Sequence, residues 1–381
     1  MRFLLIGNPD NRRVVLFRAA LARLDQPEPD IVTWRDLARR PDGLDALDEE
    51  PRIVRIDSFG EDDEVTRALL ALGHDDAIRE DVSVVSPREL ARRPMRNGEI
   101  LAPRQQHLGL LRVLDAMDQS LARRPSWRVL TAPAAIRDLF DKRITSRLYA
   151  SRGIPVARAL TDAADPGRLR ASMDARALSM VWVKLASGSS ASCLAVLQRH
   201  AGSEWLMTTI EATPDGWFNS LTVRRVEQPS HIDTILRWLL REGCHVEENV
   251  PKARLANRHF DCRVLVVDGE PAFTVVRTST HPITNLHLGG RRGDLPLLRA
   301  ACPAARWDAA MASCREVAAL HGAFQVGIDL AFTRGYRAHA VLEANAFGDL
   351  LPGLQRDGLD VYAWQITRAL RRFARSEVND L

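Results

Sequence analysis

Gly327-Ile328-Asp329-Leu330 is followed, after a short interval, by Val341-Leu342-Glu343-Ala344-Asn345. Both segments are mostly apolar, as buried strands are, and a carboxylate interrupts each apolar run. Side chains two residues apart on a strand project from the same face, so Glu343 and Asn345 face one way. A hairpin whose centre lies near residue 336 would place Asp329 opposite Glu343. The sequence therefore predicts two carboxylates and a carboxamide on one patch of sheet.

Asp329, Glu343 and Asn345 form a candidate metal site. Their hard oxygen atoms suit Mg²⁺, with Mn²⁺ as an alternative, and water or phosphate would complete the coordination shell. The competing interpretation is a solvated sheet face on which each carboxylate pairs with an arginine. Apolar neighbours on both strands favour the metal site over that alternative.

A second candidate site surrounds Lys184, which ends an apolar strand at 181–184 and precedes a run of small residues at 185–192. Backbone N–H groups and hydroxyls of such a loop can approach phosphate oxygens without obstruction, while the lysine supplies charge. The alternative is an ordinary hairpin loop of small residues. The loop positions of interest are Ser187, Gly188, Ser189 and Ser190.

Lysine is rare in this chain. Only three of the 53 basic residues are lysines, namely Lys142, Lys184 and Lys252. GC-rich coding explains most of the skew. A lysine is nevertheless a compact point charge that reaches one oxygen without needing a planar partner, so the retained lysines mark positions where geometry could demand one. The sequence assigns no role to Lys252.

Composition excludes several classes of protein. The chain has 381 residues, 46% of them hydrophobic and 27% charged, which indicates a globular protein of two or three domains. The net charge of +4 comes from arginines spread along the chain, so no nucleic-acid partner is expected. Five cysteines without CxxC spacing predict free thiols in the cytoplasm. No segment has the roughly 20 apolar residues of a membrane helix, and the first apolar run is too short for a signal peptide.

Residues 1–132 are predicted to form one open α/β domain. Apolar runs at 3–6, 53–57 and 127–130 alternate with segments of helical periodicity. No GxGxxG follows the first run, which favours a scaffold domain without a nucleotide of its own. Some polar residues follow the strand ends, where open sheets bind ligands, and are candidates for substrate contact: Asn8, Asp10, Arg12, Asp57 and Ser58.

The rest of the chain predicts an α+β arrangement, which we divide into 133–245 and 246–381. A helix over 134–151 is followed by short strands at 181–184, 193–197, 205–210 and 221–225 and by a helix over 232–241. Asp268-Gly269 joins strands at 260–267 and 272–277 in the manner of a tight hairpin. Further helices are expected near 306–320 and 360–373.

An ordered set of motifs resembles the ATP-grasp superfamily over residues 141–353. Asp141-Lys142, the segment 153–156 and Lys184 with its loop resemble the first ATP-binding half. The segments 246–250, 260–263 and 285–290 are similar to the ribosomal-protein S6 glutamate-ligase branch, and Asp329, 341–345 and 351–354 resemble the metal-binding end. The stretches 284–294 and 343–354 resemble an uncharacterised bacterial ATP-grasp group more closely. The resemblance implies an ATP-grasp fold preceded by an N-terminal α/β domain.

The resemblance also implies roles for individual residues. Lys142 and Lys184 would contact ATP phosphates, Glu248 and Asn249 would face adenine and ribose, and Asp261 would lie near the ribose. The loop residues named above and Asn285 would complete the ATP site, and Asp329, Glu343 and Asn345 would hold Mg²⁺. Arg263 would stabilise the transferred phosphoryl group. The S6-ligase branch has an arginine at the position where this chain has Ile283. Arg277 is the candidate to supply that positive charge here.

The implied activity is an ATP-dependent carboxylate–amine ligation through an acyl phosphate. The partners would be a carboxylate substrate and an amine, amino acid or peptide acceptor, and a homodimer is left open. One alternative is a kinase that transfers phosphate without ligation. Another is a non-catalytic nucleotide-binding module, which the intact set of Asp329, Glu343, Asn345 and Lys184 disfavours.

Overall fold

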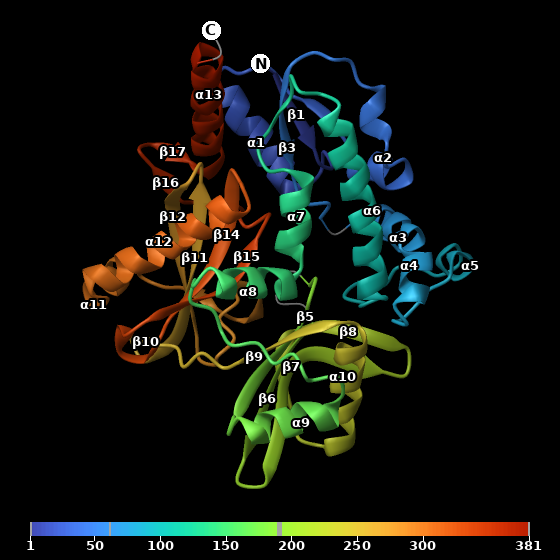
Figure 1. Ribbon diagram of the computed structural model, residues 1–381, viewed down its shortest axis with the longest axis vertical. Coiled ribbons are helices and arrows are strands. Elements are labelled where there is room, and N and C mark those ends of the chain that lie inside the picture. Colours follow the sequence, from blue (N-terminus) through green and yellow to red (C-terminus); the bar gives the residue numbers. More distant parts are fainter. Residues whose placement is uncertain (1, 61, 189–192, 380–381) are drawn as a thin grey trace.

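The computed structural model describes residues 2–60, 62–188 and 193–379. These residues form three larger sheets with helices packed on them and one small two-stranded sheet (Figure 1). The N-terminal sheet occupies one end of the molecule and a five-stranded antiparallel sheet the other. A larger antiparallel sheet lies beside them, and both chain termini lie at the N-terminal end. Among the described helices, none has the length and apolar character needed to cross a membrane.

The N-terminal sheet is parallel, with strand order β2-β1-β3-β4. Every side chain from Phe3 to Ile6 is buried, because helices cover both faces of the sheet. This explains why the sequence shows a continuous apolar run rather than an alternating one. The strands are β1 (Arg2–Ile6), β2 (Asp30–Val32), β3 (Arg52–Ile56) and β4 (Arg128–Val129). The helices are α1 (Arg12–Arg23), α2 (Trp34–Arg39), α3 (Asp63–Leu72), α4 (His74–Arg79), α5 (Pro87–Leu90) and α6 (Pro103–Ala122).

The single helix predicted over 134–151 is wrong. Two helices, α7 (Pro133–Phe140) and α8 (Lys142–Ser151), meet at Asp141, whose backbone is extended. The Asp141 carboxylate accepts a hydrogen bond from the Arg143 N–H at 2.9 Å and so caps α8. Although burial acts against its charge, Arg143 lowers the pKa of Asp141 to about 2. The break places Lys142 at the first position of α8 rather than in the middle of a helix.

The five-stranded sheet has the order β8-β7-β6-β5-β9, and α9 (Pro166–Ala175) and α10 (Pro229–Arg241) pack against its apolar face. Its strands are β5 (Met180–Leu185), β6 (Leu194–His200), β7 (Ser203–Thr213), β8 (Gly216–Val226) and β9 (Cys244–Glu248). The expected boundary at 245/246 falls inside β9, which pairs with β5 along Val181–Leu185. The sheet therefore continues to Glu248.

The larger sheet has the order β13-β12-β11-β14-β15, with β10 paired to β11. Asp268 and Gly269 both have positive φ, 50° and 75°, so the predicted tight hairpin between β11 and β12 is confirmed. The strands are β10 (Arg254–Leu255), β11 (Arg258–Val267), β12 (Glu270–Ser279), β13 (Arg291–Arg292), β14 (Gln325–Phe332) and β15 (His339–Asn345). The remaining elements are α11 (Leu295–Ala301), α12 (Ala304–Leu320), β16 (Gln355–Arg356), β17 (Leu359–Asp360) and α13 (Val361–Asn379).

The last helix joins the C-terminal part to the N-terminal domain. α13 lies beside α1 (Figure 1), and Tyr362 and Ile366 share one apolar core with Phe3 and Phe17. The N-terminal domain and the larger sheet are thus packed together through a buried interface rather than linked by a flexible segment.

A buried group of charges crosses this interface and centres on Arg55 of β3. Its guanidinium donates to both carboxylate oxygens of Asp57, at 3.0 and 2.8 Å, and to Asp349 Oδ2 at 2.6 Å. It also donates to the side-chain oxygens of Gln325 and Gln365 at 2.7 and 2.6 Å. Asp57 was a candidate for substrate contact, but it is fully buried in this group. Arg55 therefore connects the N-terminal sheet to β14, α13 and the loop after β15.

Replacing Arg55 with Met should destabilise the protein strongly, because it leaves Asp57 and Asp349 buried without their shared cation. The expected loss is about 3–5 kcal/mol of unfolding free energy, read from the urea midpoint and slope. The control is Arg40→Met, since Arg40 pairs with Asp42 on the surface and should contribute little. Equal urea midpoints for the two variants would contradict a structural role for Arg55.

Candidate active site

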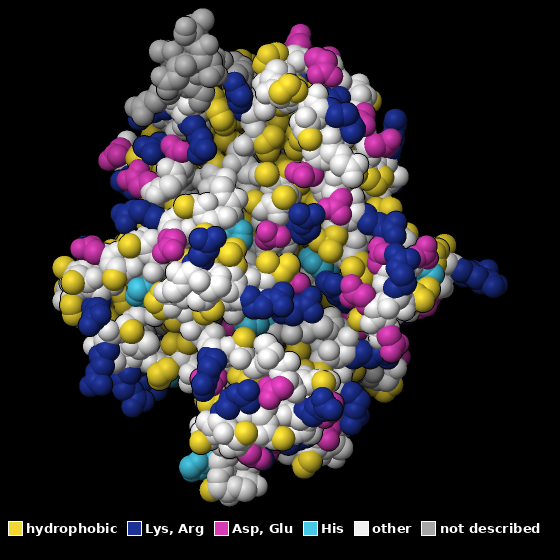
Figure 2. All heavy atoms as spheres, viewed as in Figure 1, with side chains coloured by type: hydrophobic (Ala, Val, Ile, Leu, Met, Phe, Trp, Pro, Cys, Tyr) yellow, Lys and Arg dark blue, Asp and Glu magenta, His cyan; other side chains and the backbone are white. Residues whose placement is uncertain are grey.

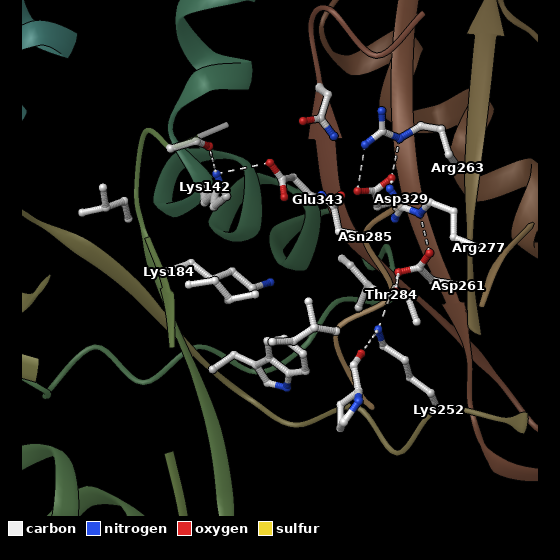
Figure 3. Close-up of a pocket in the computed structure, with 18 residues that line it drawn as sticks. Lys142, Lys184, Lys252, Asp261, Arg263, Arg277, Thr284, Asn285, Asp329 and Glu343 are labelled. Carbon is white, nitrogen blue, oxygen red and sulfur yellow. Dashed lines mark hydrogen bonds and ion pairs between the residues drawn. The ribbon is translucent and has the colours of Figure 1, made fainter. Parts of the chain in front are cut away.

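A cavity of about 110 Å³ lies between the five-stranded sheet and the larger sheet. Side chains from β5, β11, β12, β14, β15 and the start of α8 reach into it (Figure 3). We call it the inner cavity. Ten of the predicted site residues line it: Lys142, Lys184, Gly188, Asp261, Arg263, Arg277, Asn285, Asp329, Glu343 and Asn345.

The predicted hairpin register is confirmed, since Asp329 on β14 is the direct partner of Glu343 on β15. Asn345 also faces the inner cavity, and its amide nitrogen donates to the Gly327 carbonyl at 3.3 Å. In that orientation the Asn345 side-chain oxygen accepts no hydrogen bond among the described residues. Three oxygen-bearing side chains thus lie on one patch, as the alternation of the strand predicted.

Two arginines hold the Asp329 carboxylate. Arg263 is opposite Asp329 across β11 and β14 and donates from Nη2 to Oδ2 at 3.0 Å. Arg277 is opposite Asp261 across β12 and β11, donates to it at 2.7 Å, and lies 3.1 Å from Asp329 Oδ1. Burial would raise the pKa of Asp329, but the two arginines outweigh burial and lower it well below its usual value. Asp329 is therefore ionised at neutral pH.

Lys142 reaches the inner cavity from the opposite side. Its ammonium group lies 3.2 Å from Glu343 Oε1 and donates to the Gly188 carbonyl at 2.6 Å. The Lys142 backbone N–H donates to the Ala186 carbonyl at 2.9 Å, which ties the start of α8 to the end of β5. The helix break at Asp141 is what directs this lysine inward, so it is largely buried rather than exposed as a helix-surface lysine would be.

Lys184 projects from β5 and forms an ion pair with Glu247 on β9. Burial opposes its charge, but the attraction of Glu247 and Glu343 outweighs burial and raises the pKa of Lys184. Burial likewise opposes the charge on Glu247, yet Lys184 and His245 lower the pKa of Glu247 to about 2. Both groups are charged at neutral pH, although Glu247 has almost no exposure to water.

Lys252, for which no role was predicted, also lines the inner cavity. Its ammonium group lies 3.6 Å from Asp261 Oδ2 and donates to the Pro282 carbonyl at 3.3 Å. Burial lowers its pKa even though Asp261 opposes this shift. All three lysines of the chain therefore line one cavity. Figure 3 shows Lys142 and Lys184 on the side opposite Asp329, and Lys252 beside Asp261. The rarity of lysine in this chain was the sequence feature from which a site role for Lys252 could have been predicted.

Comparison with solved structures identifies the fold. The crystal structure of D-cycloserine synthetase DcsG is 15% identical, with a TM-score of 0.55 over 97% of this chain and 99% of that one. ATP-grasp ligase PsnB complexed with a minimal precursor is 14% identical, with a TM-score of 0.53 over 97% of this chain and 99% of that one. The chain has the ATP-grasp fold.

A third solved structure is similar over nearly the whole chain. Macrocyclase MdnC from Microcystis aeruginosa MRC, bound with precursor peptide MdnA, is 12% identical, with a TM-score of 0.52 over 98% of this chain and 100% of that one. No protein-family model matches the sequence, and no curated protein matches it significantly. The predicted ATP-grasp fold is confirmed at the level of structure.

Some predicted ATP-grasp positions lie outside the inner cavity. The Glu248 side chain is ion-paired with Arg158, and it projects from the face of β9 opposite to its neighbour Glu247. Asn249 accepts a hydrogen bond from the Trp182 indole at 3.0 Å and lines an adjoining hollow of about 420 Å³ that includes Lys252. Ser187 does not line the inner cavity, and Ser189 and Ser190 lie outside the described residues.

Besides Lys252, seven described residues of the inner cavity were not predicted as site residues, and three of them, Trp182, Ile283 and Thr284, bear on the site. Trp182 projects from β5, and Ile283 packs against it in a small apolar cluster. Thr284 donates from its hydroxyl to the Asp261 carboxylate. The position at which the S6-ligase branch has an arginine is therefore apolar here, and Arg277 is a cation that pairs with both Asp261 and Asp329.

The donor set is compatible with a divalent metal ion of the Mg²⁺ type. Among the described residues, no group of three or more His, Cys, Asp or Glu side chains is arranged to hold a metal. Two carboxylates and one carboxamide supply only part of the six oxygens that Mg²⁺ prefers. A metal bound here would take the rest from water and from a phosphate-bearing ligand, which fits a metal that arrives together with a nucleotide.

The Lys184–Glu247 pair should make stability depend on pH at both extremes. Glu247 has a pKa of about 2 in the fold against an ordinary 4.5, so its stabilisation is complete above pH 4.5 and is lost as the pH falls towards 2. Lys184 has a raised pKa, so its stabilisation is complete below its ordinary 10.5 and is lost as the pH rises beyond it.

Urea midpoints of the wild type and Glu247→Gln, measured from pH 2 to 7, test the acid limb. The variant should be less stable at pH 7, and the difference should shrink as the pH falls from 4.5 towards 2. Comparing the two proteins removes the contribution of other carboxylates. Parallel profiles would show that Glu247 is not held ionised by Lys184.

Proposed function

We propose that this protein is an ATP-dependent ligase that activates a carboxylate as an acyl phosphate and joins it to an amine or similar nucleophile. The observation that carries the proposal is the inner cavity of an ATP-grasp fold, where three lysines and two arginines face three carboxylates and two carboxamides. Excess positive charge in a largely buried site complements a polyphosphate.

In this proposal the nucleotide phosphates lie between Lys142 and Lys184, which approach from different elements. The adenine end lies towards the hollow beside Asn249, because Lys252 lines both that hollow and the inner cavity. Asp261 and Asn285 complete the polar lining between these two ends. The ammonium groups offer single donors that follow the phosphate oxygens, which suits a group that must move during transfer.

Asp329, Glu343 and Asn345 would hold Mg²⁺, or Mn²⁺ in its place, and the metal would neutralise charge on the phosphates when bound. PsnB has been solved with a phosphomimetic variant of its minimal precursor, Mg and ADP. Arg263 and Arg277, held rigidly by Asp329 and Asp261, would stabilise the phosphoryl group and the tetrahedral adduct with preorganised positive charge.

The proposed reaction has two steps. A carboxylate oxygen attacks the γ-phosphorus, the bond to the β–γ bridging oxygen breaks, and ADP leaves. The nucleophile then attacks the acyl carbon, phosphate leaves, and the nucleophile gives up its proton. The residues named above bind, orient and stabilise the reacting groups in both steps.

A peptide is the favoured form of at least one substrate. MdnC was solved with precursor peptide MdnA, and a RiPP-associated ATP-grasp ligase of Chryseobacterium gregarium was solved with ADP and a leader and core peptide. Those two proteins have TM-scores of 0.52 to this chain. The large hollow beside the inner cavity, described below, supports the same preference.

Replacement of Lys184 should abolish most ADP formation when the protein is incubated with MgATP and a cell extract. Lys184→Ala should lose about 100-fold or more, the effect of removing one preorganised charge from a transition state. Lys184→Arg should lose more than about tenfold although charge is kept, because the bulkier guanidinium must fit between Glu247 and the Trp182 ring. Arg224→Ala, which breaks an exposed pair with Glu211, is the control.

Product analysis in the same incubations separates the proposed ligase from its rivals. A ligase yields ADP, free phosphate and a condensed product. A kinase yields ADP and a phosphorylated compound without free phosphate. A binding module yields no ADP beyond the level of the Lys184→Ala variant.

A further inference from the structure

A second cavity of about 630 Å³ adjoins the inner cavity, and we call it the outer cavity. The two share Lys142, Arg263, Arg277 and Glu343 in their linings, so a molecule in the outer cavity reaches the proposed phosphoryl-transfer centre. The volume lies within the range of cavities that enclose small organic ligands.

The N-terminal domain supplies the far wall of the outer cavity. Residues 11–13, at the start of α1, and Ser58, Phe59 and Gly60, after β3, line it. Of the five polar residues predicted after the strand ends, Arg12 and Ser58 lie here. Asn8 and Asp57 are buried in the domain, and Asp10 pairs with Arg35. The scaffold domain thus contributes directly to the cavity beside the inner cavity.

The charge of the outer cavity is strongly biased towards positive. Glu343 is the only carboxylate among its described lining residues, and Lys142 pairs with it. Arg13 is neutralised by Asp349 at 3.3 Å and also donates to the Phe347 carbonyl at 2.9 Å. Arg12, in contrast, has no ion pair within the part of the chain that the structure describes, although it is exposed on the cavity wall.

Apolar side chains also line the outer cavity, in addition to Arg12 and the charged residues shared with the inner cavity. They are contributed by α7, by the loop after β15 and by the segment after β3: Phe59, Leu139, Phe140, Phe347, Leu350 and Leu351. Phe140 and Phe347 contact each other edge to face, with ring centroids 5.7 Å apart. A ligand that fills this space has an apolar body and anionic groups.

We propose that the outer cavity binds the carboxylate substrate as a peptide-like acid with two anionic groups. One carboxylate faces Arg263 and Arg277, where it would be activated, the apolar part lies against the phenylalanine and leucine side chains, and the second carboxylate pairs with Arg12. This proposal rests on the proposed ligase function for the role of the first carboxylate. The preference for a second anion depends only on Arg12 and the outer cavity.

The experiment compares two defined probes, N-acetyl-Glu-Phe and N-acetyl-Gln-Phe, which differ by one carboxylate. Isothermal titration calorimetry measures their dissociation constants for the whole protein, with AMPPNP and Mg²⁺ and again without nucleotide. The wild type should bind the diacid about tenfold tighter or more. Arg12→Ala should weaken binding of the diacid to the level of the monoacid and leave the monoacid unchanged.

Two further variants separate recognition from general effects of charge. Arg12→Lys should retain part of the preference for the diacid, because a cation remains. Arg18→Ala removes another α1 arginine, which pairs with Glu28 outside the cavity, and should change neither constant.

The outcomes distinguish this inference from the proposed function. Failure of AMPPNP to bind would count against the ligase proposal, while the titrations without nucleotide would still report on Arg12. No binding of the diacid, equal binding of both probes, or an equal loss for both in Arg12→Ala would overturn the second-anion proposal.

Discussion

The chain of buried charges Asp261–Arg277–Asp329–Arg263 is the interaction on which the candidate site depends. Buried charges are costly unless each has a partner, and here the partners lie directly opposite one another across β12, β11 and β14. The sheet register therefore fixes the position of every charge. Close packing reinforces this, because Gly327 and Gly348 approach so closely that a Cβ on Gly327 would lie 2.5 Å from the Gly348 Cα.

The charged side chains of the site form ion pairs with one another. Lys142 pairs with Glu343, Lys184 with Glu247, and Arg263 with Asp329, so the cavity holds many charges without leaving one isolated. In the function that we propose, a polyphosphate would take the lysines and a metal ion would take the carboxylates. Arg55 holds the N-terminal sheet against the site, because it donates a hydrogen bond to Asp349 in the loop that follows Asn345.

Local sequence patterns predicted those features of the site that depend on residues close together in the chain. The two-residue alternation and the symmetry of one hairpin were enough to place Asp329 opposite Glu343 and to put Asn345 on the same patch. The break at Asp141 was missed because helical periodicity continues through it, and only the cap and the contact of Lys142 with Ala186 reveal it. Glu247 and Glu248 are adjacent on β9, so their side chains point to opposite faces of the sheet. Which of the two faces Lys184 depends on how β9 pairs with β5. Lys252 and Arg55 acquire their partners only in the folded chain.

A structure of the protein with AMPPNP and Mg²⁺ tests the central claim most directly. Phosphate oxygens should lie within hydrogen-bonding distance of the Lys142 and Lys184 ammonium groups. The metal should be coordinated by oxygens of Asp329, Glu343 and Asn345 at about 2.1 Å. A nucleotide bound away from these lysines, or a metal held by other residues, would contradict the account.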